Sequence, residues 1–185
     1  MSEAPDALAR VALALARDAV EQYVRSGLIP ERPPSVPEAL DRPSGVFVTL
    51  RVRGRLRGCV GTLAPARPDA AREIVACAIA AASTDPRFPP VRPDELADLH
   101  YEVDVVGFVE DVAGPGDLDP KVYGVLVEAE GRRGVLLPDL EGVESVERQI
   151  ETARAKAGLA ADAAVRLSRF RVHRFVEPLG SPEGC

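Results

Sequence analysis

The stretch Leu56-Arg57-Gly58-Cys59-Val60-Gly61-Thr62-Leu63 places one cysteine between two glycines and two residues after an arginine. Glycine lets another chain or a ligand approach the backbone closely, so this arrangement indicates a site built for access. The preceding residues, Gly45 to Val52, are mostly β-branched and apolar and predict a strand. Arg53-Gly54 predicts a tight turn. Arg55 to Thr62 then becomes the antiparallel partner strand, which carries the cysteine.

Two registers of this hairpin are open. A two-residue turn places Cys59 opposite Val48, whereas a three-residue loop pairs Cys59 with Thr49. In both registers, strict alternation along the second strand puts Arg57 and Cys59 on one face and Leu56 on the other. We therefore expect the side chains of Cys59 and Arg57 to point toward the same face of the sheet.

The rest of the chain alternates helices and strands irregularly. Apolar residues at three- and four-residue steps predict helices over residues 6–25, 69–83 and 143–157, with a short helical turn from Pro93. Further strands are predicted over 99–109, 122–128, 134–137 and 165–176. Because strand pairs are separated by helices without regular alternation, we predict an α+β fold with a mixed or mostly antiparallel sheet flanked by helices.

Composition and length describe one globular domain over residues 1–185, with a Pro-rich crossing at 27–44 and a loose tail at 178–185. A net charge of −6 disfavours a broad nucleic-acid footprint. Three cysteines in this spacing fit neither a disulfide framework nor a zinc ribbon, which favours a reducing cytoplasm. The first residues are acidic and lack a continuous apolar segment, and no apolar run reaches the length that spans a bilayer, so we expect neither a secretory signal nor a membrane-spanning segment.

Taken together, these segments resemble the AMMECR domain family, whose prokaryotic members are called AmmeMemoRadiSam system protein A. The family hallmark Leu-Arg-Gly-Cys-Ile-Gly corresponds to Leu56–Gly61, with Val60 in the isoleucine position. Other family signatures follow in the expected order: Gly45–Leu50, Asp85–Val91, Glu102, Gly134–Pro138 and Lys156–Leu159. The resemblance implies an α+β fold with a smaller second lobe and the cysteine motif near the cleft between the two parts. It also implies genomic association with Memo-like and radical-SAM proteins.

The candidate catalytic residues are Cys59, Arg57 and Glu102. Cys59 is the candidate nucleophile, and Arg57 is its expected electrostatic partner. Glu102, which the family pattern carries, is the expected base or orienting residue. The alternative for Cys59 is a small buried thiol in a tightly packed hairpin, since free cysteine is among the most buried residue types.

The candidate binding residues are Gly58, Gly61, Asp85 and Arg87. The glycines could present backbone N–H groups to an oxyanion, while Asp85 and Arg87 either bind a polar ligand or clamp the hairpin through an ion pair. His100 alternates with Glu102 along a strand, but a metal site needs partners from elsewhere, and we predict no metal and no cofactor.

Two functions are consistent with these residues. The first is an enzyme that uses Cys59 on a small-molecule substrate or in group transfer. The second is a non-catalytic adaptor or substrate-presenting protein for Memo-like and radical-SAM partners.

Overall fold

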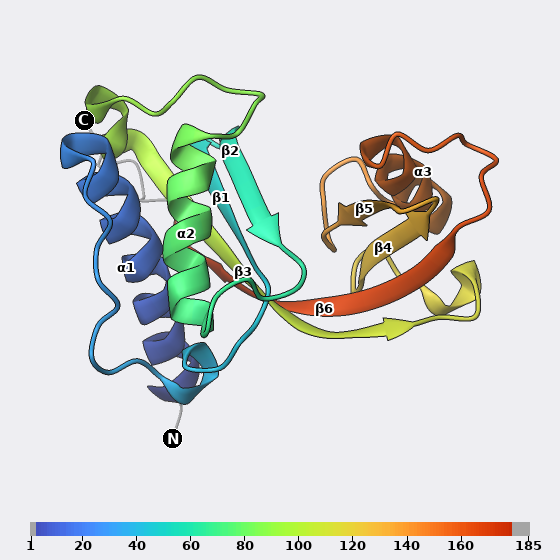
Figure 1. The fold of residues 1–185 in the computed structure, drawn as a ribbon, viewed down its shortest axis with the longest axis horizontal. Helices are drawn as coiled ribbons and strands as arrows, with labels where there is room; N and C mark the ends of the chain where they lie inside the picture. Colours follow the sequence, from blue (N-terminus) through green and yellow to red (C-terminus); the bar gives the residue numbers. More distant parts are fainter. Residues whose placement is uncertain (1–2, 179–185) are drawn as a thin grey trace. The chain divides into compact units, whose positions relative to one another are not determined.

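The structure is a computed structural model that describes residues 3–178. It has two compact units: residues up to Val105 together with those from Arg174 onward form unit 1, and Val106–His173 form unit 2 (Figure 1). The strands follow the order β2-β1-β3-β6-β4-β5 in a six-stranded sheet. The predicted α+β class with a smaller second lobe is confirmed. Most of the predicted tail, residues 179–185, lies outside the described residues.

The elements follow the predicted order with small shifts at their ends. In chain order they are α1 (Glu3–Ser26), η1 (Glu38–Leu40), β1 (Val46–Val52), β2 (Arg55–Thr62), α2 (Ala70–Ser83), η2 (Pro93–Asp98), β3 (Leu99–Asp111), η3 (Pro115–Asp117), β4 (Gly124–Ala129), β5 (Arg132–Leu136), α3 (Val146–Lys156) and β6 (Arg166–Val176). The segment between α1 and β1 contains only the short η1.

Unit 1 packs α1 and α2 together and α2 against β1 and β2. Its core takes alternate residues of β1, Val46, Val48 and Leu50, all fully buried. Small alanines along α1 and α2 let the helices and the sheet approach closely. Helix α2 begins at the predicted position because the Asp69 side chain caps it, accepting a hydrogen bond from the backbone N–H of Arg72 at 2.8 Å.

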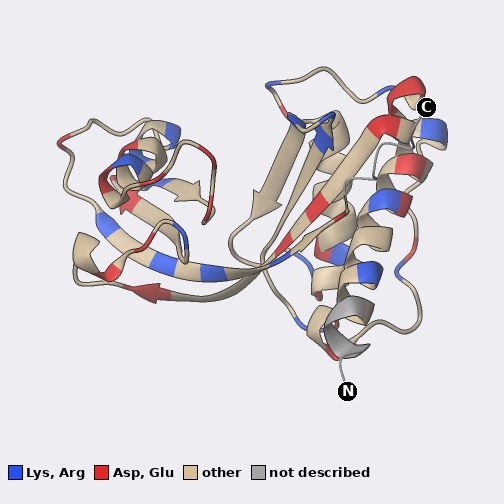
Figure 2. Cartoon of the chain, turned by 180° about the vertical axis from the view of Figure 1, so that it is seen from behind, with Lys and Arg blue, Asp and Glu red and all other residues tan. Residues whose placement is uncertain are grey.

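Unit 2 packs α3 against β4 and β5 around a separate apolar core. Several arginines lie along the part of β6 that belongs to this unit: Arg166, Arg169 and Arg171 (Figure 2). The acidic residues Glu110 and Asp111 lie at the end of β3. Two of these arginines are paired: Arg169 with Glu110 at 2.7 Å, and Arg166 with Glu128 at 2.5 Å. Much of the positive charge on this strand is therefore balanced within the unit.

Candidate functional site

The β1–β2 hairpin contains a β-bulge, which settles the register. The turn has two residues, Arg53 and Gly54, both with positive φ (50° and 76°), as the sequence predicts. Beyond the turn, Arg51 pairs with Leu56, whereas Leu50 pairs with Gly58. One residue of β2, Arg57, is thus left without a partner in β1. The register shift brings Cys59 opposite Thr49.

Steric and burial constraints explain why the extra residue lies there. Leu50 is fully buried beneath the helices, so its β2 partner faces α2. A Cβ atom on Gly58 would lie 2.2 Å from the backbone oxygen of Ala81 in α2, so only glycine fits this place. Regular pairing after a two-residue turn would put the Arg57 side chain there instead. The bulge removes that conflict.

The bulge also corrects our prediction about the faces of β2. Leu56 and Cys59 pair with Arg51 and Thr49, two positions of β1 that share one face. Leu56 and Cys59 therefore lie on the same face, whereas strict alternation had put them on opposite faces. The error came from assuming an uninterrupted strand.

The Cys59 thiol is half-buried, and its partner is a hydroxyl group. Thr49 Oγ1 donates a hydrogen bond to Cys59 Sγ at 3.3 Å. Thr49 is itself only 5% exposed, so its hydroxyl is held in place by packing. Thr49 was not among the predicted site residues, although one of the two open hairpin registers places it opposite the cysteine.

The Cys59 backbone is held by the loop that follows α2. Its N–H donates to Asp85 Oδ2 at 2.9 Å, and its carbonyl accepts from Arg87 Nη2 at 3.2 Å. Arg87 Nε and Nη2 bind the Asp85 carboxylate at 2.9 and 2.7 Å. The Asp85 side chain is only 2% exposed, and the guanidinium holds the pKa of this carboxyl well below its usual range. The predicted clamp of the hairpin is thus present.

Arg57 binds the same loop further along. Its Nε and Nη2 donate to the two carboxylate oxygens of Glu95 at 2.7 and 3.0 Å, and Nη1 donates to the Pro89 carbonyl at 2.9 Å. Nη2 also reaches the Pro90 carbonyl at 3.3 Å. This bidentate contact lowers the pKa of Glu95. Within residues 3–178, the hydrogen bonds of the Arg57 guanidinium therefore go to Glu95 and to the loop carbonyls, and none goes to the cysteine sulfur.

Glu95 was also absent from the predicted site. The signal for it lies at the helical turn that starts at Pro93, where the Glu95 carboxylate accepts from the backbone N–H of Arg92 at 2.9 Å. An acidic residue three positions after a helix start is a known capping pattern. Its second role, as the partner of Arg57, could not be read from the sequence.

Glu102 stands in one row with Thr49 and Cys59 across β3, β1 and β2. Two strand spacings, about 10 Å, separate its backbone from that of Cys59, and Thr49 lies between them. The Glu102 carboxylate pairs with Arg174 at 3.1 Å and with Arg51 at 3.6 Å. It is placed to orient these arginines, and the thiol receives its hydrogen bond from Thr49.

The other polar residues of β3 do not form a metal site. Asp104 is fully buried and pairs with Arg174 Nε at 2.7 Å; burial raises the pKa of its carboxyl against the opposing effect of the arginine. His100 pairs with Arg51 in the sheet. Within residues 3–178, no three His, Cys, Asp or Glu side chains gather closely enough to hold a metal ion.

Packing accounts for Gly61 and Cys77. A Cβ atom on Gly61 would lie 2.3 Å from the ring of Phe47, so this glycine makes room for the aromatic side chain. Cys77 is buried in α2, and burial raises the pKa of its thiol to about 12. Of the two cysteines in the described part of the chain, Cys59 is the more accessible.

Fold and hairpin together define an α+β protein built around a clamped cysteine hairpin. The chain belongs to the AMMECR1 family, whose model matches residues 13–176. A protein of Thermotoga maritima is 51% identical over 159 residues, which cover 84% of this chain and 91% of that protein. Protein CA_C1420 of Clostridium acetobutylicum is 44% identical over 165 residues, 88% of this chain and 35% of the larger protein.

A solved structure has the same fold. The crystal structure of the uncharacterised protein PH0010 from Pyrococcus horikoshii superimposes with a TM-score of 0.85 at 32% sequence identity, covering 90% of each chain. In the described part of the present chain, none of the helices combines the length and apolar character that a bilayer crossing requires.

Proposed function

We propose that this protein is a binding module that presents a rigid surface, formed by the loop of residues 85–92 and strand β2, to a partner protein. The observation that carries the proposal is the double attachment of this loop. Asp85 and Arg87 hold its start on Cys59, and Arg57 holds its end through the carbonyls of Pro89 and Pro90.

Such attachment matters because the loop is exposed. Pro86, Arg87, Pro89 and Pro90 are all exposed, while Asp85 beneath them is buried. An exposed segment that is already fixed in one conformation loses little entropy on binding, so more of the contact energy remains as affinity. Arg57 and Asp85, which could have served chemistry at the thiol, are instead engaged in holding this surface.

The partner class comes from the family. The resemblance to the AMMECR domain family implies genomic association with Memo-like and radical-SAM proteins, and we propose proteins of these two kinds as the partners. The guanidinium of Arg92, beside the prolines, is exposed and pairs with the exposed carboxylate of Asp94, and a carboxylate on the partner can replace Asp94 there.

Co-purification from a cell that expresses the three proteins tests this proposal. The complex should survive Cys59→Ser, because that change leaves the loop intact. It should be lost in the double variant Pro90→Ala and Arg92→Ala, which alters the exposed surface while keeping the carbonyl that Arg57 binds. A complex that persists in both variants would contradict the proposal, as would a complex lost only in Cys59→Ser.

The Thr49 hydrogen bond to Cys59 Sγ favours a second function, in which the cysteine is a nucleophile in group transfer. In an acyl transfer, the sulfur would bond to the acyl carbon, and the leaving group would depart with the electron pair of the broken bond. The thiol proton would pass through solvent to that leaving group. Glu102, which pairs with Thr49 on the strand β3 side, would help to orient Thr49 and Cys59. Arg87 would place a positive charge beside the cysteine.

Iodoacetamide labelling at neutral pH tests this second function. If Cys59 is a nucleophile, it should be labelled faster in the native protein than in the unfolded chain, and Thr49→Val should slow that reaction. Arg57→Ala should slow it as well by releasing the loop. A thiol that is inert in the native protein would exclude the nucleophile, without bearing on the binding module.

A further inference from the structure

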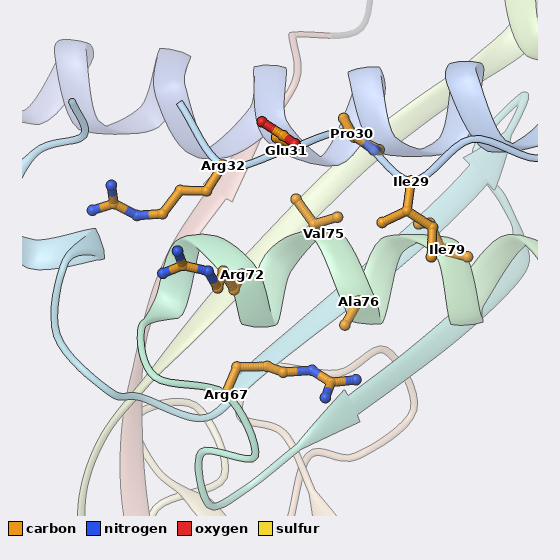
Figure 3. Close-up of a pocket in the computed structure, with 9 residues that line it drawn as sticks. All are labelled: Ile29, Pro30, Glu31, Arg32, Arg67, Arg72, Val75, Ala76 and Ile79. Carbon is orange, nitrogen blue, oxygen red and sulfur yellow. The ribbon is translucent and has the colours of Figure 1, made fainter. Parts of the chain in front are cut away.

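A cavity of about 570 Å³ lies within unit 1, between α2 and the Pro-rich crossing that follows α1 (Figure 3). Small-molecule sites commonly have volumes of roughly 300–1,000 Å³. Its lining contains neither Cys59 nor Arg57, nor the residues that hold the cysteine hairpin. It is therefore a separate feature of the fold.

One side of the cavity is apolar. Val75, Ala76 and Ile79 occupy neighbouring turns of α2, and Ile29 of the crossing lies beside Ile79 in Figure 3. Ile29 is 66% exposed although it is a large aliphatic residue. An apolar side chain left open beside a cavity is one that a ligand can cover, which gives a favourable free energy of burial.

Three arginines line the cavity, and one of them carries an uncompensated charge. Arg32 and Arg72 both pair with the buried carboxylate of Asp69. Arg32 also pairs with Asp41, so two carboxylates balance these two arginines. Arg67 is exposed, and no carboxylate within residues 3–178 forms an ion pair with it. A lone guanidinium next to an apolar wall offers a bidentate contact to an anionic group.

The acidic residue of the cavity lies away from this guanidinium. In Figure 3 the Glu31 carboxylate is on the α1 side of α2, and the Arg67 guanidinium is on the other side, near Ala76. An anion would thus be attracted to one end of the cavity and repelled from the other, so a ligand with a charged end and an apolar body has one favoured direction.

We propose that this cavity binds a small amphipathic anion, a molecule with an apolar chain or ring and one terminal carboxylate or phosphate. The anionic end binds Arg67, and the apolar body lies along Ala76 and Ile79 toward Ile29. This site is independent of the binding surface proposed above.

Isothermal titration calorimetry with decanoate, decyl phosphate and decylamine tests the proposal on the full chain. One molecule of decanoate or of decyl phosphate should bind per protein, and decylamine should bind at least tenfold more weakly. Arg67→Gln should weaken binding of the anions about tenfold, since it removes one charge-assisted contact. Whichever of the two anions binds with the higher affinity indicates whether the natural ligand carries a carboxylate or a phosphate.

Three further variants sharpen the result. Ala76→Glu places a carboxylate on a half-exposed position of the apolar wall and should reduce anion binding as strongly as Arg67→Gln. Glu31→Gln should leave anion binding unchanged or strengthen it. The matched control is Arg53→Gln in the distant β1–β2 turn, where the side chain is 85% exposed, and it should bind as the unaltered protein does.

Several outcomes would overturn the proposal. They are equal binding of decylamine and decanoate, absence of binding by either anion, an unchanged affinity in Arg67→Gln, and an equal loss of affinity in Arg53→Gln. None of these results would affect co-purification with protein partners, so the two proposals fail separately.

Discussion

Replacing Asp85 with alanine should lower the free energy of unfolding of unit 1 by about 2–3 kcal/mol. The carboxylate accepts four hydrogen bonds, one from the Cys59 N–H and three from Arg87. Removing one member of a fully buried ion pair costs about 3–5 kcal/mol. We expect less here because the Arg87 side chain is 51% exposed and water can solvate the released guanidinium.

Urea unfolding followed by circular dichroism measures this change. The chain supplies a matched control, because Arg92 binds Asp94 through the same two nitrogens, at 3.0 and 2.8 Å, over the same two-residue separation. That pair is exposed, so Asp94→Ala should leave the unfolding curve unchanged. Equal effects of the two substitutions, or a loss below about 1 kcal/mol for Asp85→Ala, would refute the role given to burial.

The same carboxylate predicts a dependence of stability on pH. Because the pKa of Asp85 is lowered in the folded protein, the unfolded chain binds a proton at this residue more readily. Its contribution is complete above the ordinary aspartate pKa of about 4 and is lost as the pH falls below that value. Unfolding measured between about pH 5 and pH 2 should therefore show a shallower acid loss in Asp85→Asn than in the unaltered protein. Parallel curves would contradict this.

Three further predictions concern individual side chains. Gly58→Ala should lower the free energy of unfolding by more than about 2 kcal/mol, because the new Cβ atom would clash with the backbone carbonyl of Ala81 in α2. The control Gly116→Ala has open space around the new Cβ atom and should change the free energy of unfolding by less than about 0.5 kcal/mol. Tyr101→Phe should be neutral or stabilising in the same assay, since the buried hydroxyl has no hydrogen-bond partner among residues 3–178, and a loss above about 1 kcal/mol would reveal one. Iodoacetamide followed by peptide mass spectrometry should label Cys59 faster than Cys77, whose raised pKa and burial suppress the thiolate, and equal rates would contradict this.

Most of the secondary structure could be predicted from local signals. The Arg53-Gly54 turn and the Asp69 start of α2 each depend on the chemistry of one or two residues, and the structure has both where the sequence put them. The hairpin register depends on something else. It is decided by the space beneath α2, where Gly58 fits and an arginine does not, and that space exists only in the folded unit.

In the candidate site, too, contacts within one short motif could be predicted from the sequence, and contacts between distant segments could not. Asp85 and Arg87 were predicted either to bind a polar ligand or to clamp the hairpin through an ion pair, and in the structure they form that pair and bind the Cys59 backbone. The partner of Arg57 lies 38 residues away in the chain, and competition between that carboxylate and the cysteine for one guanidinium cannot be judged from spacing. Glu102 was predicted as a base or orienting residue from the family pattern alone, and its place in the same sheet row as Cys59, with Thr49 between them, was not predicted.

The pair formed by Asp85 and Arg87 has a consequence for the solubility of the protein. Strand β2 is the first in the strand order, and the backbone N–H and carbonyl of Cys59 are bound on the side away from β1. One carboxylate and one guanidinium supply the acceptor and the donor that a further strand would offer there. Sheet edges left open can pair with strands of other molecules and seed aggregation. The Asp85 and Arg87 side chains therefore occupy the hydrogen-bonding groups of Cys59, near the middle of strand β2, that another strand would otherwise use.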